Sequence, residues 1–128
     1  MDFFDVPIYK WRFKMNKLLS NVALSEIKIG GMSEVSFTFI NTINGEYLKT
    51  LKCKNVVKLS YENALEDDFP CFISEVYSKK VSREDTHETF QHFHVGTNKL
   101  LNKDCFLLSI ESGDVDIDIL CESFDLLV

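Results

Sequence analysis

Three histidines lie close together in one short segment of the chain. His92 and His94 are two positions apart, so a β-strand would place both imidazoles on one face, where two zinc ligands can sit. His87 or Glu88 could supply a third ligand. However, a His-Phe-His alternation is also typical of any surface strand with one polar face. We therefore predict no metal site, and a metal-dependent enzyme using the three histidines is kept only as a minor alternative.

The four cysteines are the other candidate metal or redox ligands. They are far apart and form no C-x-x-C pair, whereas metal sites need clustered ligands and disulfide frameworks need an oxidising compartment. Free cysteines usually behave as small buried hydrophobic residues. We expect four reduced and mostly buried thiols, at Cys53, Cys71, Cys105 and Cys121.

Acidic side chains gather at two places in the second half of the chain. Acid–base catalysis needs two carboxylates in different environments, and calcium sites need a glycine-punctuated loop of oxygen ligands. Neither pattern is present. We expect instead a surface for a cationic partner, built from Glu62, Glu66, Asp67, Asp68, Asp114, Asp116, Asp118 and Glu122.

Motifs for nucleophilic or phosphate chemistry are missing from the sequence. It has no G-x-S-x-G, no phosphate-binding glycine loop and no dinucleotide fingerprint. We therefore expect no catalytic residues, no enzyme activity and no cofactor. Basic residues beside Trp11 and Phe13, and four lysines between positions 49 and 58, could hold nucleic acid. Lysines also protect sheet edges, and the acidity of the chain argues against a nucleic-acid partner.

The net charge of −6 is divided unevenly along the chain. Residues 1–60 hold nine Lys and Arg against five Asp and Glu, a charge of +4. Residues 61–128 hold five against fifteen, a charge of −10. Such asymmetry indicates a charged partner. The acidic half would repel nucleic acid and attract a basic protein, such as a nuclease that holds phosphates.

Length and composition predict one globular domain, residues 1–128, with 45% hydrophobic residues. No apolar run approaches the roughly 18 residues that span a bilayer. Asp2 and Asp5 stand where a signal peptide would need basic residues. We therefore expect a cytoplasmic protein with no membrane partner. The sequence leaves its oligomeric state open.

Apolar and polar residues alternate along most of the chain, which is typical of half-buried strands. About eight short strands, separated by turn signals, predict a mainly β protein with little helix: an antiparallel β-sandwich or a partly open barrel. A short edge element is expected within residues 1–19, and loops at 62–70 and 79–86. The strands are expected around 22–29, 35–39, 51–53, 56–61, 72–77, 89–95, 106–110 and 115–121.

An Asn-Gly dipeptide at 44–45 is a strong hairpin signal. A two-residue loop would pair Phe37 with Lys52 and place a lysine on the apolar face. A three-residue loop over 43–45 pairs Phe37 with Leu51 instead, which keeps the apolar faces together. We predict the second register with Gly45 at positive φ, and a core face formed by Val35, Phe37, Phe39, Leu51 and Cys53. A second long hairpin is expected around the Ser-Gly-Asp turn at 112–114.

The order of these segments resembles small β-rich immunity proteins of bacterial polymorphic-toxin and contact-dependent growth-inhibition systems. It is carried by Trp11 and by residues 18–29, 35–39, 47–48, 56–59 and 114–126. The resemblance covers most of the chain and lies in strand pattern and spacing. It implies a cytosolic protein that binds one cognate toxin domain tightly and blocks its active site, without catalytic residues. The alternative is a β protein whose interior holds a small apolar molecule, lined by some of the eleven phenylalanines.

Overall fold

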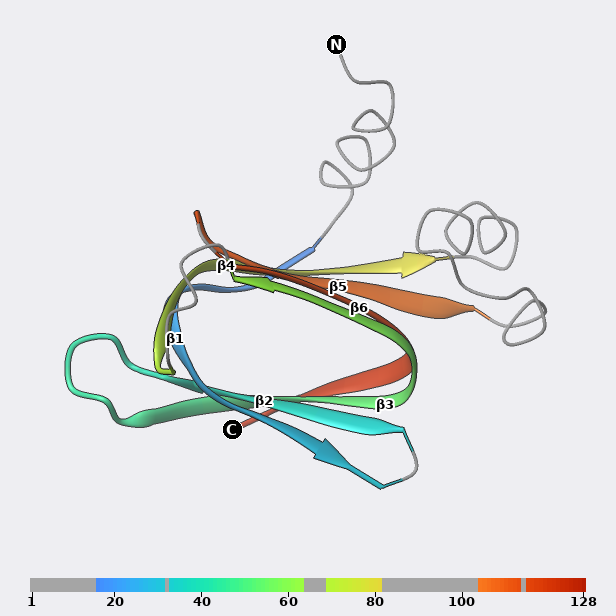
Figure 1. Cartoon of the computed structure of the whole chain (residues 1–128), viewed down its shortest axis with the longest axis horizontal. Helices are drawn as coiled ribbons and strands as arrows, with labels where there is room; N and C mark the ends of the chain where they lie inside the picture. Colours follow the sequence, from blue (N-terminus) through green and yellow to red (C-terminus); the bar gives the residue numbers. More distant parts are fainter. Residues whose placement is uncertain (1–15, 32, 64–68, 82–103, 114) are drawn as a thin grey trace, which may run out of the picture.

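The computed structural model describes residues 16–31, 33–63, 69–81, 104–113 and 115–128. These ranges contain six antiparallel strands and no helix (Figure 1). The predicted all-β, antiparallel class is confirmed, whereas the expected number of about eight strands is wrong for the described ranges. The expected strand at 89–95 and most of the edge element at 1–19 lie outside them. The six strands are β1 (Asn16–Gly30), β2 (Glu34–Ile40), β3 (Tyr47–Asn63), β4 (Cys71–Val81), β5 (Cys105–Glu111) and β6 (Val115–Leu127).

Two strands are longer than the sequence predicted: the strands expected at 51–53 and 56–61 are both part of β3, and the strand expected at 22–29 is part of β1. In β1 the register shifts between Leu24 and Glu26, and in β3 it shifts between Val56 and Lys58. Asn55, just before the second shift, has a φ of 54°, a conformation that asparagine tolerates better than most residues. A bulge bends a strand and interrupts its alternation without ending its pairing. The broken alternation therefore looked like a strand end in the sequence.

The sheet closes on itself. β1 pairs with β2 through its C-terminal half and with β4 through its N-terminal half, which gives the closed order β1-β2-β3-β6-β5-β4. The long strands bend and run from one layer of the flattened ring to the other (Figure 1). The bend of β3 is fastened to the β1–β2 turn, because Val56 N donates a 2.8 Å hydrogen bond to the carbonyl oxygen of Ser33.

The hydrophobic core lies inside this ring. Phe37 pairs with Leu51 and Val35 with Cys53, as predicted, and all five predicted core residues of this hairpin are buried. The second predicted hairpin is also confirmed, with Ile110 opposite Ile117 in β5 and β6. Because a six-stranded ring is narrow, these side chains fill its interior. The core cluster also includes Leu24 of β1 and Ile73 of β4, so all six described strands meet there.

The β2–β3 turn reaches the predicted register by a different route. Asn41 N donates to the carbonyl oxygen of Glu46 at 2.8 Å, which leaves a four-residue loop, Thr42–Gly45. Phe39 pairs with Lys49 and Ile40 with Tyr47, so Leu48 is an extra, bulged residue. The longer loop and the bulge offset each other. The predicted three-residue loop is therefore wrong, while the pairing of the core residues is right.

The first residues of two segments that were expected to be loops belong to strands. Glu62 and Asn63 belong to the end of β3, and residues 79–81 belong to the end of β4. Polar residues at these positions suggested loops, but Lys79 and Lys80 pair with Leu107 and Phe106 of β5. A paired strand needs only one apolar face when the other meets water. The polar composition of these ends therefore did not mark the strand boundaries.

We expect Gly45→Ala to destabilise the protein. Gly45 has a φ of 73°, where a Cβ atom costs about 1 kcal/mol or more. Gly31→Ala is the matched control, because a Cβ at Gly31 meets nothing within 4 Å and its φ lies outside the left-handed region. Urea unfolding of the two variants measures the difference. Equal midpoints for both would contradict the assigned conformation of the turn.

All four cysteines are free thiols and are buried, as the sequence predicted. The thiols of Cys53 and Cys121 lie side by side within the core and are fully buried. The hydrogen bond to Cys121 raises the pKa of the Cys53 thiol far above its ordinary value, and burial raises it further. The thiolate is the reactive form of cysteine, so Cys53 is inert in the folded protein.

The raised pKa of Cys53 predicts a stability loss at alkaline pH. The folded protein retains a proton that the unfolded chain releases above about pH 8.5. Stability from this group is therefore complete below that pH and falls above it, by up to about 1.4 kcal/mol per pH unit. The measurement is unfolding free energy against pH for the parent and for Cys53→Val. An equal alkaline slope in both proteins would contradict the pKa shift.

Candidate interaction surface

Four carboxylates from four neighbouring strands lie in one line across the outer surface of the sheet. Glu62 of β3 pairs with Asp116 of β6, and Asp116 pairs with Glu111 of β5. Glu111 in turn pairs with Glu75 of β4. Neighbouring strands are about 4.8 Å apart, so the line is about 14 Å long. We call Glu62, Asp116, Glu111 and Glu75 the acidic row.

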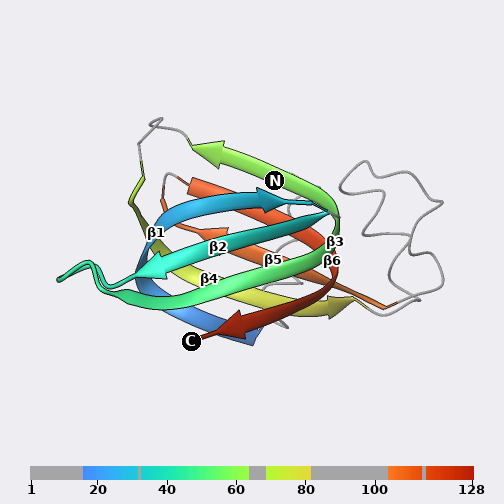
Figure 2. The same cartoon turned by 90° about the horizontal axis from the view of Figure 1, so that it is seen from below.

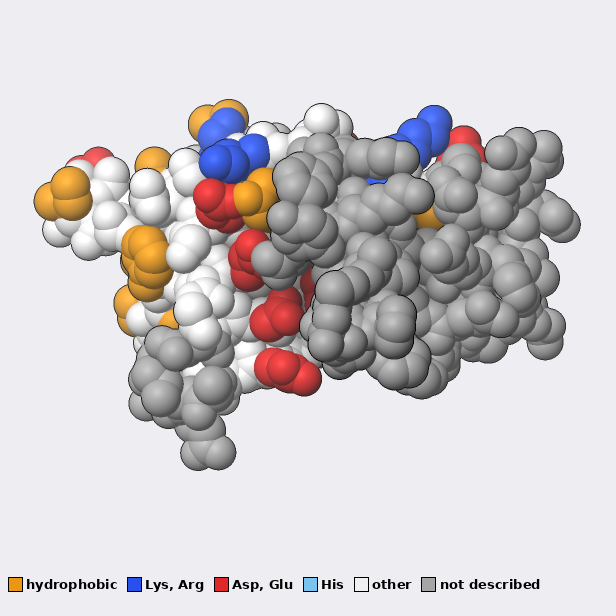
Figure 3. All heavy atoms as spheres, turned by 90° about the horizontal axis from the view of Figure 1, so that it is seen from above, with side chains coloured by type: hydrophobic (Ala, Val, Ile, Leu, Met, Phe, Trp, Pro, Cys, Tyr) orange, Lys and Arg blue, Asp and Glu red, His pale blue; other side chains and the backbone are white. Residues whose placement is uncertain are grey.

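Figure 3 shows acidic side chains running across this face, with basic side chains at one end. At the β4 end of the row, Nζ of Lys17 on β1 lies 3.3 Å from Oε1 of Glu75. Asp118 lies two residues beyond Asp116 on β6 and adds a half-buried carboxylate beside the row. Like charges in directly opposed positions destabilise a sheet. The row therefore costs folding energy, as binding surfaces commonly do.

The predicted partner-binding residues formed two groups in the sequence, one near Glu62 and one near Asp116. The fold brings some members of the two groups together. Glu62, from the first group, lies beside Asp116 and Asp118 from the second. Glu122 is separated from them, because it follows the buried Leu120 on β6 and accepts a 3.3 Å hydrogen bond from Nδ2 of Asn55. The other predicted partner-binding residues lie outside the described ranges: Glu66, Asp67, Asp68 and Asp114.

Two members of the acidic row were missed by the sequence analysis. Glu111 could have been predicted from the sequence, because the register of the β5–β6 hairpin places it opposite Asp116. Glu75 could not, because its place depends on the pairing of β4 with β5, strands separated by a long connection. Hairpin registers follow from local turns, whereas pairings between distant strands leave no local signal.

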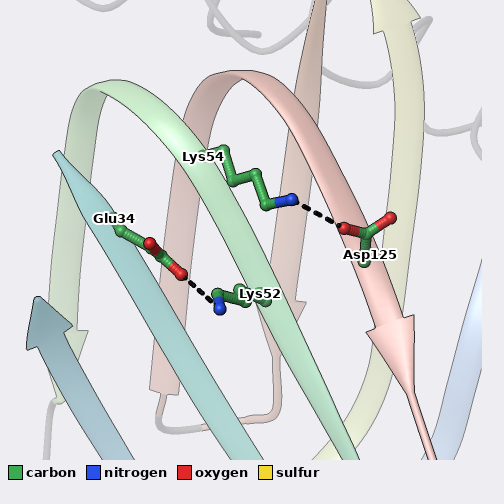
Figure 4. A network of polar contacts seen from close by, with 4 residues as sticks. All are labelled: Glu34, Lys52, Lys54 and Asp125. Carbon is green, nitrogen blue, oxygen red and sulfur yellow. Dashed lines mark ion pairs between the residues drawn. The ribbon is translucent and has the colours of Figure 1, made fainter. Parts of the chain in front are cut away.

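The charges on the opposite layer are arranged differently. Nζ of Lys52 lies 2.7 Å from Oε1 of Glu34, and Nζ of Lys54 lies 3.2 Å from Oδ2 of Asp125 (Figure 4). Positive and negative side chains therefore alternate across β2, β3 and β6. This pairing takes up two of the four lysines that suggested nucleic-acid binding.

Metal chemistry finds no support in the described ranges, where no group of three or more His, Cys, Asp and Glu side chains is placed to hold an ion. The predicted alternative site at His87, His92 and His94 lies outside them. In the same described portion, no helix is long and apolar enough to cross a membrane.

The closed six-stranded antiparallel sheet defines the class of the protein. A family model described only as "-like" matches residues 17–127, and the chain belongs to that family. The fold is similar to that of an uncharacterized protein from Neisseria gonorrhoeae, known from a crystal structure, with a TM-score of 0.62 and 21% identity. That match covers 88% of this chain and 95% of the other. A comparison with curated proteins gives no match.

Neutralising one member of the acidic row should stabilise the fold. In Glu62→Gln the charge opposite Asp116 is lost, and we expect the unfolding free energy to rise by roughly 0.2–1 kcal/mol at low salt. The gain should shrink in about 1 M salt, where screening is nearly complete at this distance. Glu46→Gln, at an exposed position in the β2–β3 turn, is the control. A stability loss in Glu62→Gln at low salt would contradict repulsion within the row.

Proposed function

We propose that this protein is a cytoplasmic immunity protein that binds and neutralises a basic, nuclease-type toxin domain of a contact-dependent growth-inhibition or related polymorphic-toxin system. The observation that carries the proposal is the acidic row. A nuclease holds phosphates with basic side chains, and four carboxylates in register offer those side chains a competing anionic surface. In this reading the protein acts by occupying the toxin, so it needs no catalytic group of its own.

The scaffold suits a binding role. Each carboxylate of the row stands on a strand that is hydrogen-bonded on both sides or packed on the core. Such preorganisation lowers the entropy lost on binding. Within the proposal, the closed sheet serves as a small barrel whose filled interior supports the outer surface. Phe37, Phe39 and other core side chains fill the interior of the closed sheet. This filling disfavours the alternative function, in which the interior holds a small molecule.

The row also sets how the partner is approached. Complementary charge accelerates encounter and excludes wrong partners, while charges desolvated at the centre of an interface slow dissociation. Lys17 neutralises part of the charge at the Glu75 end of the row. We place the basic active site of the toxin against the row.

The proposal predicts a charge-dependent complex. Glu62→Gln with Glu111→Gln should weaken binding to the toxin domain by about tenfold at low salt and flatten its salt dependence, because two steering charges are lost. Glu26→Gln with Glu46→Gln removes the same charge elsewhere and should bind like the parent. Affinity is measured by titration calorimetry at several salt concentrations.

The biological test is co-expression with the variable C-terminal domain of a large secreted protein encoded beside this chain. The parent and the Glu26→Gln, Glu46→Gln control should rescue cells from that domain, whereas the Glu62→Gln, Glu111→Gln variant should protect less well. If both double variants bind and protect like the parent at low and at physiological salt, the electrostatic account of this protein is wrong.

A further inference from the structure

The C-terminal part of β3 lies at an edge of the sheet. β2 pairs with β3 only as far as Cys53, whereas β6 pairs with it as far as Asn63. In the described part of the chain, residues 57–62 therefore have β6 on one side and no strand on the other, as the outlying arrow of β3 shows in Figure 2. An edge of this kind presents backbone N–H and C=O groups that another extended segment can pair with.

This edge carries different chemistry on its two faces. Glu62, on the outer face, is the end of the acidic row. Tyr61 points the other way, opposite the core residue Ile117, yet 44% of it is exposed. The ring of Phe69 meets the Tyr61 ring edge to face, with centroids 6.5 Å apart. Nδ2 of Asn63 donates a 3.2 Å hydrogen bond to the Tyr61 hydroxyl, so the ring is held in place.

Charge complementarity indicates which kind of segment would bind at this edge. Successive side chains of an extended segment point to opposite faces, so a segment paired with β3 would offer one side chain to Glu62 and the next to the aromatic pair. A cation suits both, because carboxylates and the faces of aromatic rings each attract positive charge. Arginine suits them better than lysine, since its planar guanidinium stacks on rings and binds carboxylates with two hydrogen bonds.

We infer that the open edge of β3 docks an extended, arginine-bearing segment of the toxin domain, with one guanidinium stacked on the Tyr61–Phe69 pair and another facing Glu62. The inference rests on the proposed function and gives it a docking geometry. Tyr61 supplies the contact that depends on ring stacking, and Glu62 supplies the contact that depends on charge. The two contributions are therefore separable by experiment.

The test uses the full chain and a peptide of about ten residues in which pairs of adjacent arginines alternate with pairs of threonines, so that both faces of the extended peptide carry arginine. A lysine analogue of the same pattern serves for comparison. Tyr61→Leu should weaken binding of the arginine peptide about two- to fivefold and leave its salt dependence unchanged. Tyr61→Phe, which keeps the ring, should bind like the parent. Tyr47→Leu is the matched control, because Tyr47 is also about half exposed but lies at the β2–β3 turn.

Backbone amide shifts measured by NMR on adding the arginine peptide should map to residues 57–62 in the parent. The inference is overturned if Tyr61→Leu binds the arginine peptide as tightly as Tyr47→Leu does, if the lysine peptide binds equally well, or if the shifts lie elsewhere. If the complex with the toxin domain still depends on salt in that case, the acidic row remains the docking surface and only the edge geometry is wrong. If, in addition, the Glu62→Gln, Glu111→Gln double variant binds the toxin domain like the parent, the proposed function is wrong as well.

Discussion

The pairing of β1 with β4 is the constraint on which the rest of the structure depends. Without it the strands would form an open sheet with β2 near one end and β4 at the other. With it, Val22 lies opposite Ile73 and Leu24 opposite Cys71, and the inward faces of all the strands turn toward one another. Closure creates an interior in which Phe37 and Phe39 lose all contact with water. Each such aromatic side chain contributes about 1.5–3 kcal/mol by burial.

Closure of the sheet also determines where the charged side chains lie on the outer surface. Because the long strands bend, single strands serve both layers, and β3 carries Lys52 and Lys54 in one half and Lys58 and Glu62 in the other. The half with Lys52 and Lys54 lies among acidic partners, while the half with Glu62 meets further acids. Folding therefore joins acids from the second half of the sequence in one row, and pairs two lysines of the first half with acids on the other layer.

Much of the fold follows from local sequence, and the rest depends on distant pairings. Matching the apolar faces of the two strands predicted the pairing of Phe37 with Leu51, and the alternation on both sides of the Ser-Gly-Asp turn predicted the hairpin in which Ile110 pairs with Ile117. The number of strands was overestimated because bulges interrupt alternation as strand ends do. For the surface, Glu62, Asp116 and Asp118 were identified by composition. That these residues lie together, and that Glu75 joins them, depends on the pairing of β3 with β6 and of β4 with β5. No local sequence pattern predicts those pairings.

The pairing of β3 with β6 joins residues that are far apart in the chain, with Thr50 opposite Leu127 and Glu62 opposite Asp116. Contacts of such sequence separation form slowly, because the intervening chain must first lose its freedom. A ribosome-bound chain lacking β6 has neither the closed core nor the acidic row. The charge pattern of this protein is thus a property of its completed topology, and a fragment with the same acids would not carry it.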